Sequence, residues 1–200
     1  MFNFLKLPTK FSRIGEFGLV VFIVALGVSL VDTIWSIYIY QYTQSDVVVG
    51  LISALFTTIS LLSFILLIPF MERNDKSLLY QWTLLLSAVC YLLFLITQSL
   101  WIIIILGIIL SILTVIRINS FGIIVCDNSK PHELGKNEGV IYTMMNVGWL
   151  MGPLISASLA ERYGFSLVFL LSAFFFFLAL GSYKFLNIGA KKRIAVSSSV

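Results

Sequence analysis

The sequence predicts an all-α membrane protein whose chain crosses the bilayer six times. Of its 200 residues, 60% are apolar and only 11% are charged, which leaves too few charges to cover the surface of a water-soluble domain. The apolar residues gather in six blocks of about 20 residues or more, the length that a helix needs to span a bilayer. Basic residues lie mostly in the connections that six crossings place on one side of the membrane.

The six apolar blocks are rich in Leu, Ile, Phe and Val, and each is a candidate transmembrane helix. They are Phe17–Tyr40, Val47–Met71, Leu78–Ile96, Leu100–Cys126, Gly139–Ala160 and Phe165–Leu186. Because the blocks are continuously apolar and do not alternate with polar residues, helices are favoured over the strands of a barrel. The expected organisation is a cytoplasmic segment at 1–16, a six-helix bundle at 17–188 and a basic, Ser-rich cytoplasmic tail at 189–200.

The Lys and Arg residues predict the orientation of the bundle. Eleven of the 13 fall on one side of six crossings: Lys6, Lys10, Arg13, Arg73, Lys76, Lys130, Lys136, Lys184, Lys191, Lys192 and Arg193. Arg162 alone falls on the other side, and Arg117 lies inside the fourth block. The positive-inside rule then places both termini in the cytoplasm, with the protein in the plasma or inner membrane. Basic residues scattered over four segments argue against nucleic-acid binding.

A short pattern occurs twice and predicts an internal repeat. The second block is followed by Glu72-Arg73 and then by Ser77-Leu78, and the fifth is followed by Glu161-Arg162 and then by Ser166-Leu167 at the same spacing. Six crossings place these two corners on opposite faces of the membrane. The sequence therefore predicts a 3+3 repeat of inverted topology, which is a signature of secondary transporters.

The fifth block carries two glycines four residues apart, followed by a proline. Gly148 and Gly152 share one helix face and allow another backbone to approach closely, and Pro153 is expected to bend the helix. Tight packing alone would also explain the glycines. The segment Gly148-Trp-Leu-Met-Gly152-Pro153-Leu-Ile-Ser156-Ala157 resembles motif C of the major facilitator superfamily, with Ser and Ala in place of the final glycines. That resemblance favours small-molecule efflux, since the motif is most typical of proton-driven exporters.

The connection after the second block is similar to motif A of the same superfamily. In Ile68-Pro-Phe-Met-Glu72-Arg73-Asn-Asp75-Lys76-Ser77, the charges of Glu72, Arg73 and Lys76 match the motif, whereas both of its glycines are absent. The resemblance implies a gating loop whose charge contacts hold one transport state. A charged loop that obeys the positive-inside rule is the simpler alternative.

The resemblance covers essentially the whole chain, as the N-terminal six-helix half of the family. The tail beginning Gly189-Ala-Lys-Lys-Arg193 resembles the start of the linker that joins the two halves. The resemblance therefore implies a partner bundle, supplied by a C-terminal half, by a separate chain or by a second copy in a homodimer.

Two charges lie well inside apolar blocks. Asp32 is nine residues before Gln41, and Arg117 is ten residues before Asp127. At about 1.5 Å per residue, both lie near the middle of a hydrocarbon core about 30 Å thick. Charges at this depth are costly and usually functional. We expect Asp32 to bind a proton or a cationic substrate, and Arg117 to modulate its pKa or pair with it; a static ion pair between helices is the alternative.

Asn146 in the fifth block is a further candidate for substrate contact, or else for a hydrogen bond between helices. The expected function is a secondary transporter that works by alternating access and is driven by an ion gradient, with the proton as the favoured ion. A non-transporting remnant or a membrane scaffold or assembly subunit is the alternative. An enzyme is not expected, because no catalytic cluster, metal pattern or nucleotide motif is present, and no cofactor is implied.

Overall fold

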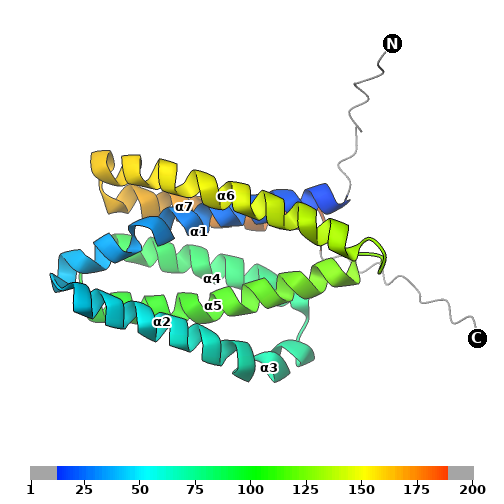
Figure 1. The fold of residues 1–200 in the computed structure, drawn as a ribbon, viewed down its shortest axis with the longest axis horizontal. Coiled ribbons are helices and arrows are strands. Elements are labelled where there is room, and N and C mark those ends of the chain that lie inside the picture. Colours follow the sequence, from blue (N-terminus) through cyan, green and yellow to red (C-terminus); the bar gives the residue numbers. More distant parts are fainter. Residues whose placement is uncertain (1–12, 189–200) are drawn as a thin grey trace, which may run out of the picture.

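The computed structural model describes residues 13–188, and across this range the chain is helical and contains no strand (Figure 1). Its helices are α1 (Arg13–Thr43), α2 (Asp46–Leu66), α3 (Ile68–Arg73), α4 (Lys76–Ile96), α5 (Leu100–Asp127), α6 (Leu134–Tyr163) and α7 (Phe165–Phe185). All except the short α3 are long and apolar enough to cross a membrane. The predicted fold class, a six-helix transmembrane bundle, is therefore confirmed. The predicted tail at 189–200 lies outside the described residues.

The largest departure from the predicted boundaries is at the second apolar block. It was expected to be one helix, but the structure divides it into α2 and α3 at Leu67. Pro69 explains the break, because it has no amide hydrogen to donate to Ile65 and its ring disfavours a continuous helix. A second departure is α6, which begins at Leu134 and so takes up part of the connection between the fourth and fifth blocks.

The helices differ widely in how much of their surface is covered. In the most apolar window of α1, 67% of the residues are buried, against 11% in α2 and 22% in α6. Figure 1 shows α1, α6 and α7 on one side and α2, α4 and α5 on the other. The closest helix pairs are α1 with α6 and α4 with α7, whereas α2 packs mainly on α5.

The two ends of the bundle differ in charge. One end holds the start of α1, the end of α7, α3 and the α5–α6 connection, all at the right of Figure 1. We call it the basic end, after Arg73, Lys76, Lys130, Lys136 and Lys184. Arg162 lies at the opposite end, with the end of α6. The two Glu-Arg corners therefore lie at opposite ends of the bundle, as the sequence predicted, while the inverted repeat itself stays a prediction.

Aromatic rings join α4 to α7 along most of their length. Phe94 and Phe169 stack with ring centroids 5.0 Å apart, and Tyr91 lies 5.3 Å from Phe176. Towards the basic end, Tyr80 and Tyr183 lie 5.0 Å apart, and the Tyr183 hydroxyl donates a hydrogen bond of 2.8 Å to the Ser77 Oγ. Such aromatic pairs add about 0.5–1.5 kcal/mol each beyond the area they bury.

The two motif glycines bring α6 against α1. A methyl group on Gly148 would lie 2.8 Å from the Ala25 Cβ, and one on Gly152 would overlap the side chain of Ser29. The Ser29 hydroxyl shares its hydrogen between the carbonyls of Leu26, at 3.1 Å, and Gly148, at 3.2 Å. The close approach that the glycine spacing predicted is therefore confirmed. Helix α6 continues through Pro153, which lies on its exposed side.

Candidate functional site

A cavity of about 500 Å³ opens between the α1–α6 and α2–α5 pairs, with tyrosines of α4 at its base. This volume falls within the range of about 300–1,000 Å³ that is usual for sites of small molecules. Most of the lining is apolar, including Val24, Val28 and Leu110, and a few polar groups interrupt it. The cavity therefore has the composition of a small-molecule site, in which a few polar groups fix the orientation of the ligand.

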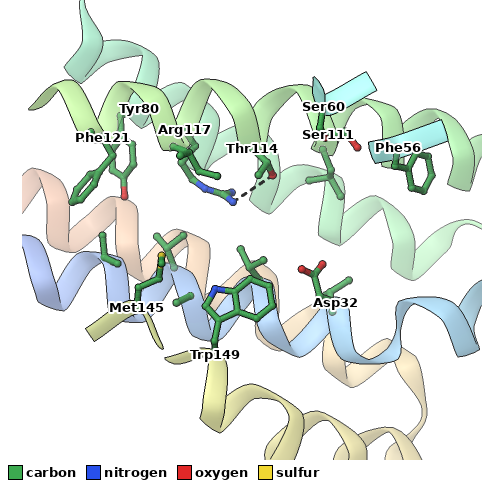
Figure 2. Close-up of a pocket in the computed structure, with 18 of the residues that line it drawn as sticks. Asp32, Phe56, Ser60, Tyr80, Ser111, Thr114, Arg117, Phe121, Met145 and Trp149 are labelled. Atoms are coloured by element: carbon green, nitrogen blue, oxygen red, sulfur yellow. Dashed lines mark hydrogen bonds between the residues drawn. The ribbon is translucent and has the colours of Figure 1, made fainter. Parts of the chain in front are cut away.

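Asp32 projects into this cavity from α1 (Figure 2). It lies one turn beyond Ser29, whose side chain is fully buried between α1 and α6. The close α1–α6 contact thus fixes the face of α1 on which Asp32 stands. Asp32 itself is exposed, and within residues 13–188 no basic side chain lies within 4.0 Å of its carboxylate.

Arg117 enters the cavity from α5 and is held by neighbours that carry no charge. Its side chain is only 6% exposed, and the guanidinium carbon lies 5.1 Å from the centre of the Phe176 ring. The Nη2 group donates a hydrogen bond of 3.4 Å to the Thr114 Oγ1, drawn as a dashed line in Figure 2. A cation–π contact of this kind stabilises a buried guanidinium but uses none of its hydrogen-bond donors.

Asp32 and Arg117 share the cavity without forming an ion pair. Across the described part of the chain, the one ion pair within 4.0 Å is the exposed contact of His132 with Glu133. Phe176 is a common reference for the two groups, because Arg117 lies over its ring and Gly27 of α1 touches it. Asp32 is five residues beyond Gly27, which places it about 7.5 Å further along the bundle at 1.5 Å per residue. Figure 2 shows the two side chains on opposite walls.

The remaining site candidates lie outside the cavity. Asn146 is exposed on α6 and does not line it, although its neighbour Met145 does. Glu72 and Arg73 are exposed at the basic end and form no ion pair within residues 13–188. The Lys76 Nζ donates hydrogen bonds to the carbonyls of Glu72, at 2.9 Å, and Asn74, at 3.0 Å. The gating contacts implied by the motif resemblance are therefore not formed among these residues, and the role of the loop stays a prediction.

The tight turn of this loop forms without the two glycines of the family motif. The Asn74 side chain donates a hydrogen bond of 2.7 Å to the Phe70 carbonyl and so gives a partner to a backbone acceptor at the end of α3. The Asp75 Oδ1 accepts one of 2.9 Å from the Leu78 amide and caps the start of α4. Polar side chains thus cap both helices at a turn where the family motif has glycine.

Sequence reasoning missed most of the polar and aromatic lining. The hydroxyl-bearing residues of α2 and α5 that line the cavity are Ser53, Thr57, Ser60, Ser111 and Thr114. Their spacing of three or four residues on each helix is the signal that could have identified them. The large aromatic residues Trp35, Phe56 and Trp149 also line it. Glu138 was expected in a connection, but it lines the cavity near the basic end because α6 begins earlier than predicted.

Six apolar helices around a cavity that presents a carboxylate and a guanidinium define a multi-pass membrane protein of the kind that transports small solutes. The family model described as Major Facilitator Superfamily matches residues 17–196. The chain therefore belongs to the major facilitator superfamily of membrane transporters, and its helices are consistent with one half of that fold. No curated protein matches the sequence.

Proposed function

We propose that the chain is one six-helix half of a secondary active transporter, which binds a small molecule in the cavity and carries it across the membrane by alternating access. The observation that carries this proposal is the exposed Asp32 carboxylate, which stands in a largely apolar cavity with no basic partner within 4.0 Å in the described chain. A charge at this depth of a membrane is costly and needs a compensating function. Family membership supports the same function.

A proton gradient is the proposed source of energy, and Asp32 is the proposed proton carrier. The titratable or charged side chains that share the cavity with it are Arg117 from α5, Tyr80 and Tyr91 from α4, and Tyr142 and Glu138 from α6. Of the two cavity carboxylates, Glu138 lies near the basic end, in the second turn of α6, and Asp32 lies deeper along the bundle. Export is the proposed direction, supported by the motif at Gly148, Gly152 and Pro153 and its resemblance to that of proton-driven exporters.

A second six-helix bundle is the proposed cover for the exposed faces of α2 and α6. These two helices are the least buried of the six, and both contribute residues to the cavity. The second bundle would be a continuation of the chain, a separate chain or a second copy, and would close the cavity from the side that is open here. The mass of the complex in membranes, measured after crosslinking, distinguishes a six-helix from a twelve-helix assembly.

The proposed orientation places the basic end in the cytoplasm, with the protein in the plasma or inner membrane. The charge difference between the two ends supports it, because basic connections are retained on the cytoplasmic side. A reporter fused after residue 188 tests this orientation, since a reporter that proved to be active outside the cell would contradict it.

The test of the function is transport by the Asp32→Asn variant in proteoliposomes with an imposed pH gradient. We expect uptake of a panel of amphiphilic amines, with accompanying proton movement, in the unmodified protein, and the loss of both in the variant. Asp46→Asn is the matched control, because Asp46 is an exposed aspartate at the start of α2, outside the cavity. Proton-coupled transport that survived in Asp32→Asn would contradict the proposal. An absence of flux in every protein would favour a scaffold or a transport-inactive remnant.

A further inference from the structure

We propose that the substrate is an elongated molecule with an ammonium group at one end, an anionic group such as a carboxylate at the other, and an apolar segment between them. The ammonium would bind at Asp32 and the anion at Arg117. This inference rests on the proposed transport function and specifies the class of molecule that the cavity takes. Three observations carry it: unused donors at one end, acceptors at the other, and an apolar stretch between the two.

The Arg117 end of the cavity presents hydrogen-bond donors that have no acceptor. A guanidinium has five N–H donors, but in the described chain Arg117 makes one hydrogen bond, the 3.4 Å contact with Thr114. The side chain is more than nine-tenths buried and points into the cavity (Figure 2). The Tyr80 hydroxyl, at the same end, has no hydrogen-bond partner within residues 13–188. A buried cation without a counter-ion is strongly unfavourable, so this end suits an anionic group of the ligand.

The Asp32 end presents acceptors. Besides the carboxylate, this part of the lining contains Ser53, Thr57 and Ser111 from α2 and α5. Each hydroxyl donates its hydrogen to a carbonyl of its own helix: Ser53 to Val49 at 2.9 Å, Thr57 to Ser53 at 3.0 Å and Ser111 to Gly107 at 2.9 Å. Their remaining lone pairs are acceptors, which suit the three donors of an ammonium group. Phe56 and Trp35, with ring centroids 5.7 Å apart, add aromatic faces that attract a cation.

The stretch between the two ends is largely apolar. Val28 and Val31 of α1 line it, and Trp149 lies between Arg117 and Asp32 in Figure 2. On α5 the lining residue between Ser111 and Arg117 is Thr114, whose hydroxyl accepts the hydrogen bond from Arg117. Asp32 lies about 7.5 Å further along α1 than Gly27, which contacts the Phe176 ring under Arg117, and the two charged side chains lie on opposite walls. A compact α-amino acid, whose charges are separated by a single carbon, is too short to contact both. A ligand with several methylene groups between its charges fits the separation and the lining.

The test uses the full chain in detergent and a series of ω-aminocarboxylates with one to eight methylene groups between ammonium and carboxylate. Binding is measured by calorimetry at constant salt. We expect affinity to pass through a maximum at a member with four or more methylenes. That member should bind at least about tenfold more tightly than the alkylamine or the alkanoate of the same length, because it alone pairs both charges. A zwitterion that binds no more tightly than the matched alkylamine would overturn the proposal.

Two cavity variants test which charged group of the ligand binds at each end of the cavity. Arg117→Gln should weaken the best zwitterion at least about tenfold and leave the alkylamine unchanged, whereas Asp32→Asn should weaken both of these ligands. Glu138→Gln tests the other cavity carboxylate, and Arg162→Gln is the matched arginine control at the opposite end of the bundle. A zwitterion affinity that Arg117→Gln leaves unchanged, or that Glu138→Gln lowers as much as Asp32→Asn does, would contradict the assignment.

Protein stability separates the anion site from a structural role of Arg117. Because its guanidinium has no carboxylate partner among the described residues, the Gln variant removes a desolvated charge and should melt no lower than the unmodified protein. Arg117→Lys keeps the charge and should retain part of the zwitterion affinity. A large fall in melting temperature with Arg117→Gln would show a structural arginine and contradict the proposal. The proposed transport function, tested through Asp32, would survive that outcome.

Discussion

The α4–α7 pair is antiparallel and the α2–α5 pair is parallel, and different contacts hold the two pairs together in one small bundle. Along α4 and α7, aromatic rings meet at ring-centroid distances near 5 Å, and a buried tyrosine hydroxyl bonds to Ser77. Between α2 and α5, the ring of Phe56 lies against Gly107, and the nearby serine and threonine hydroxyls bond to their own helices.

We call the α4–α7 pair the frame, because it supports the bundle, whereas the α2–α5 pair forms a wall of the cavity. The α4–α7 pair makes large contacts between side chains of the two helices, so moving one helix against the other would break several aromatic pairs. The hydroxyls of α2 and α5 make no such contacts across the pair and remain available as acceptors to a ligand. Helix α1 belongs to both regions, because one of its faces packs on α6 and α7 and another carries Asp32 into the cavity.

The largest expected loss of stability comes from the frame. Phe169→Ala removes a fully buried ring that contacts Phe94 and Tyr38, at 5.0 Å and 4.8 Å between centroids. We expect a loss of about 3 kcal/mol, the lower end of the range for phenylalanine in soluble cores, because lipid solvates apolar groups as well as a protein core does. Phe174→Ala, at an exposed position of the same helix, is the control and should melt unchanged. Equal losses of stability in Phe169→Ala and Phe174→Ala would show that the aromatic contacts of the frame do not stabilise the bundle.

A smaller loss is expected where α1 meets α6. Gly152→Ala adds a methyl group that overlaps Ser29 and forces the two helices apart, at a cost of about 2 kcal/mol. Gly139→Ala makes the same substitution in the same helix, at a position with nothing within 4 Å, and should be neutral or slightly stabilising. The two melting temperatures, measured in the same detergent, should therefore differ. A Gly152→Ala variant as stable as Gly139→Ala would contradict the close contact.

The smallest effect is expected at the tyrosine that closes the frame near the basic end. Tyr183→Phe keeps the ring and removes the hydrogen bond to Ser77, which should cost about 1 kcal/mol. Tyr163→Phe removes the hydroxyl of an exposed tyrosine at the end of α6 and serves as the control. Thermal unfolding of both variants measures the difference. If Tyr183→Phe lowered the melting temperature no more than Tyr163→Phe does, the hydrogen bond to Ser77 would not contribute to the stability of the frame.

Much of the fold could be predicted from the sequence, because lipid permits few solutions. Six continuously apolar blocks have to be helices, and the helix boundaries follow to within a few residues except where Pro69 divides the second block and where α6 begins at Leu134. The contact of α1 with α6 could be anticipated from Gly148 and Gly152, since two glycines on one face have no other packing role. The identity of α1 as the partner helix could not be predicted, because a glycine face is equally compatible with any neighbouring helix.

The candidate site could be predicted only where a residue was costly in its setting. Asp32 and Arg117 were identified because charges inside apolar blocks are rare. Serines and threonines such as Ser53 and Ser111 are tolerated throughout membrane helices, where their hydroxyls bond to the backbone of the same helix. The sequence alone therefore did not distinguish the residues that line the cavity from other serines and threonines. Whether Asp32 and Arg117 pair also depended on tertiary structure. Their estimated depths allowed contact, whereas the packing of Arg117 on Phe176 places it on the wall opposite Asp32.

The central claim is that the cavity beside α2 is open to water within the membrane, and its most direct test is labelling of single cysteines by a water-soluble maleimide in intact membranes. Thr57 lines the cavity, and Leu55, two residues away at almost the same depth, is exposed but does not line it. In a background of Cys90→Ser and Cys126→Ser, we expect Thr57→Cys to react and a bound ω-aminocarboxylate to protect it, while Leu55→Cys stays unlabelled in lipid. Equal labelling of the two positions, or none at Thr57→Cys, would contradict the existence of the cavity in the membrane.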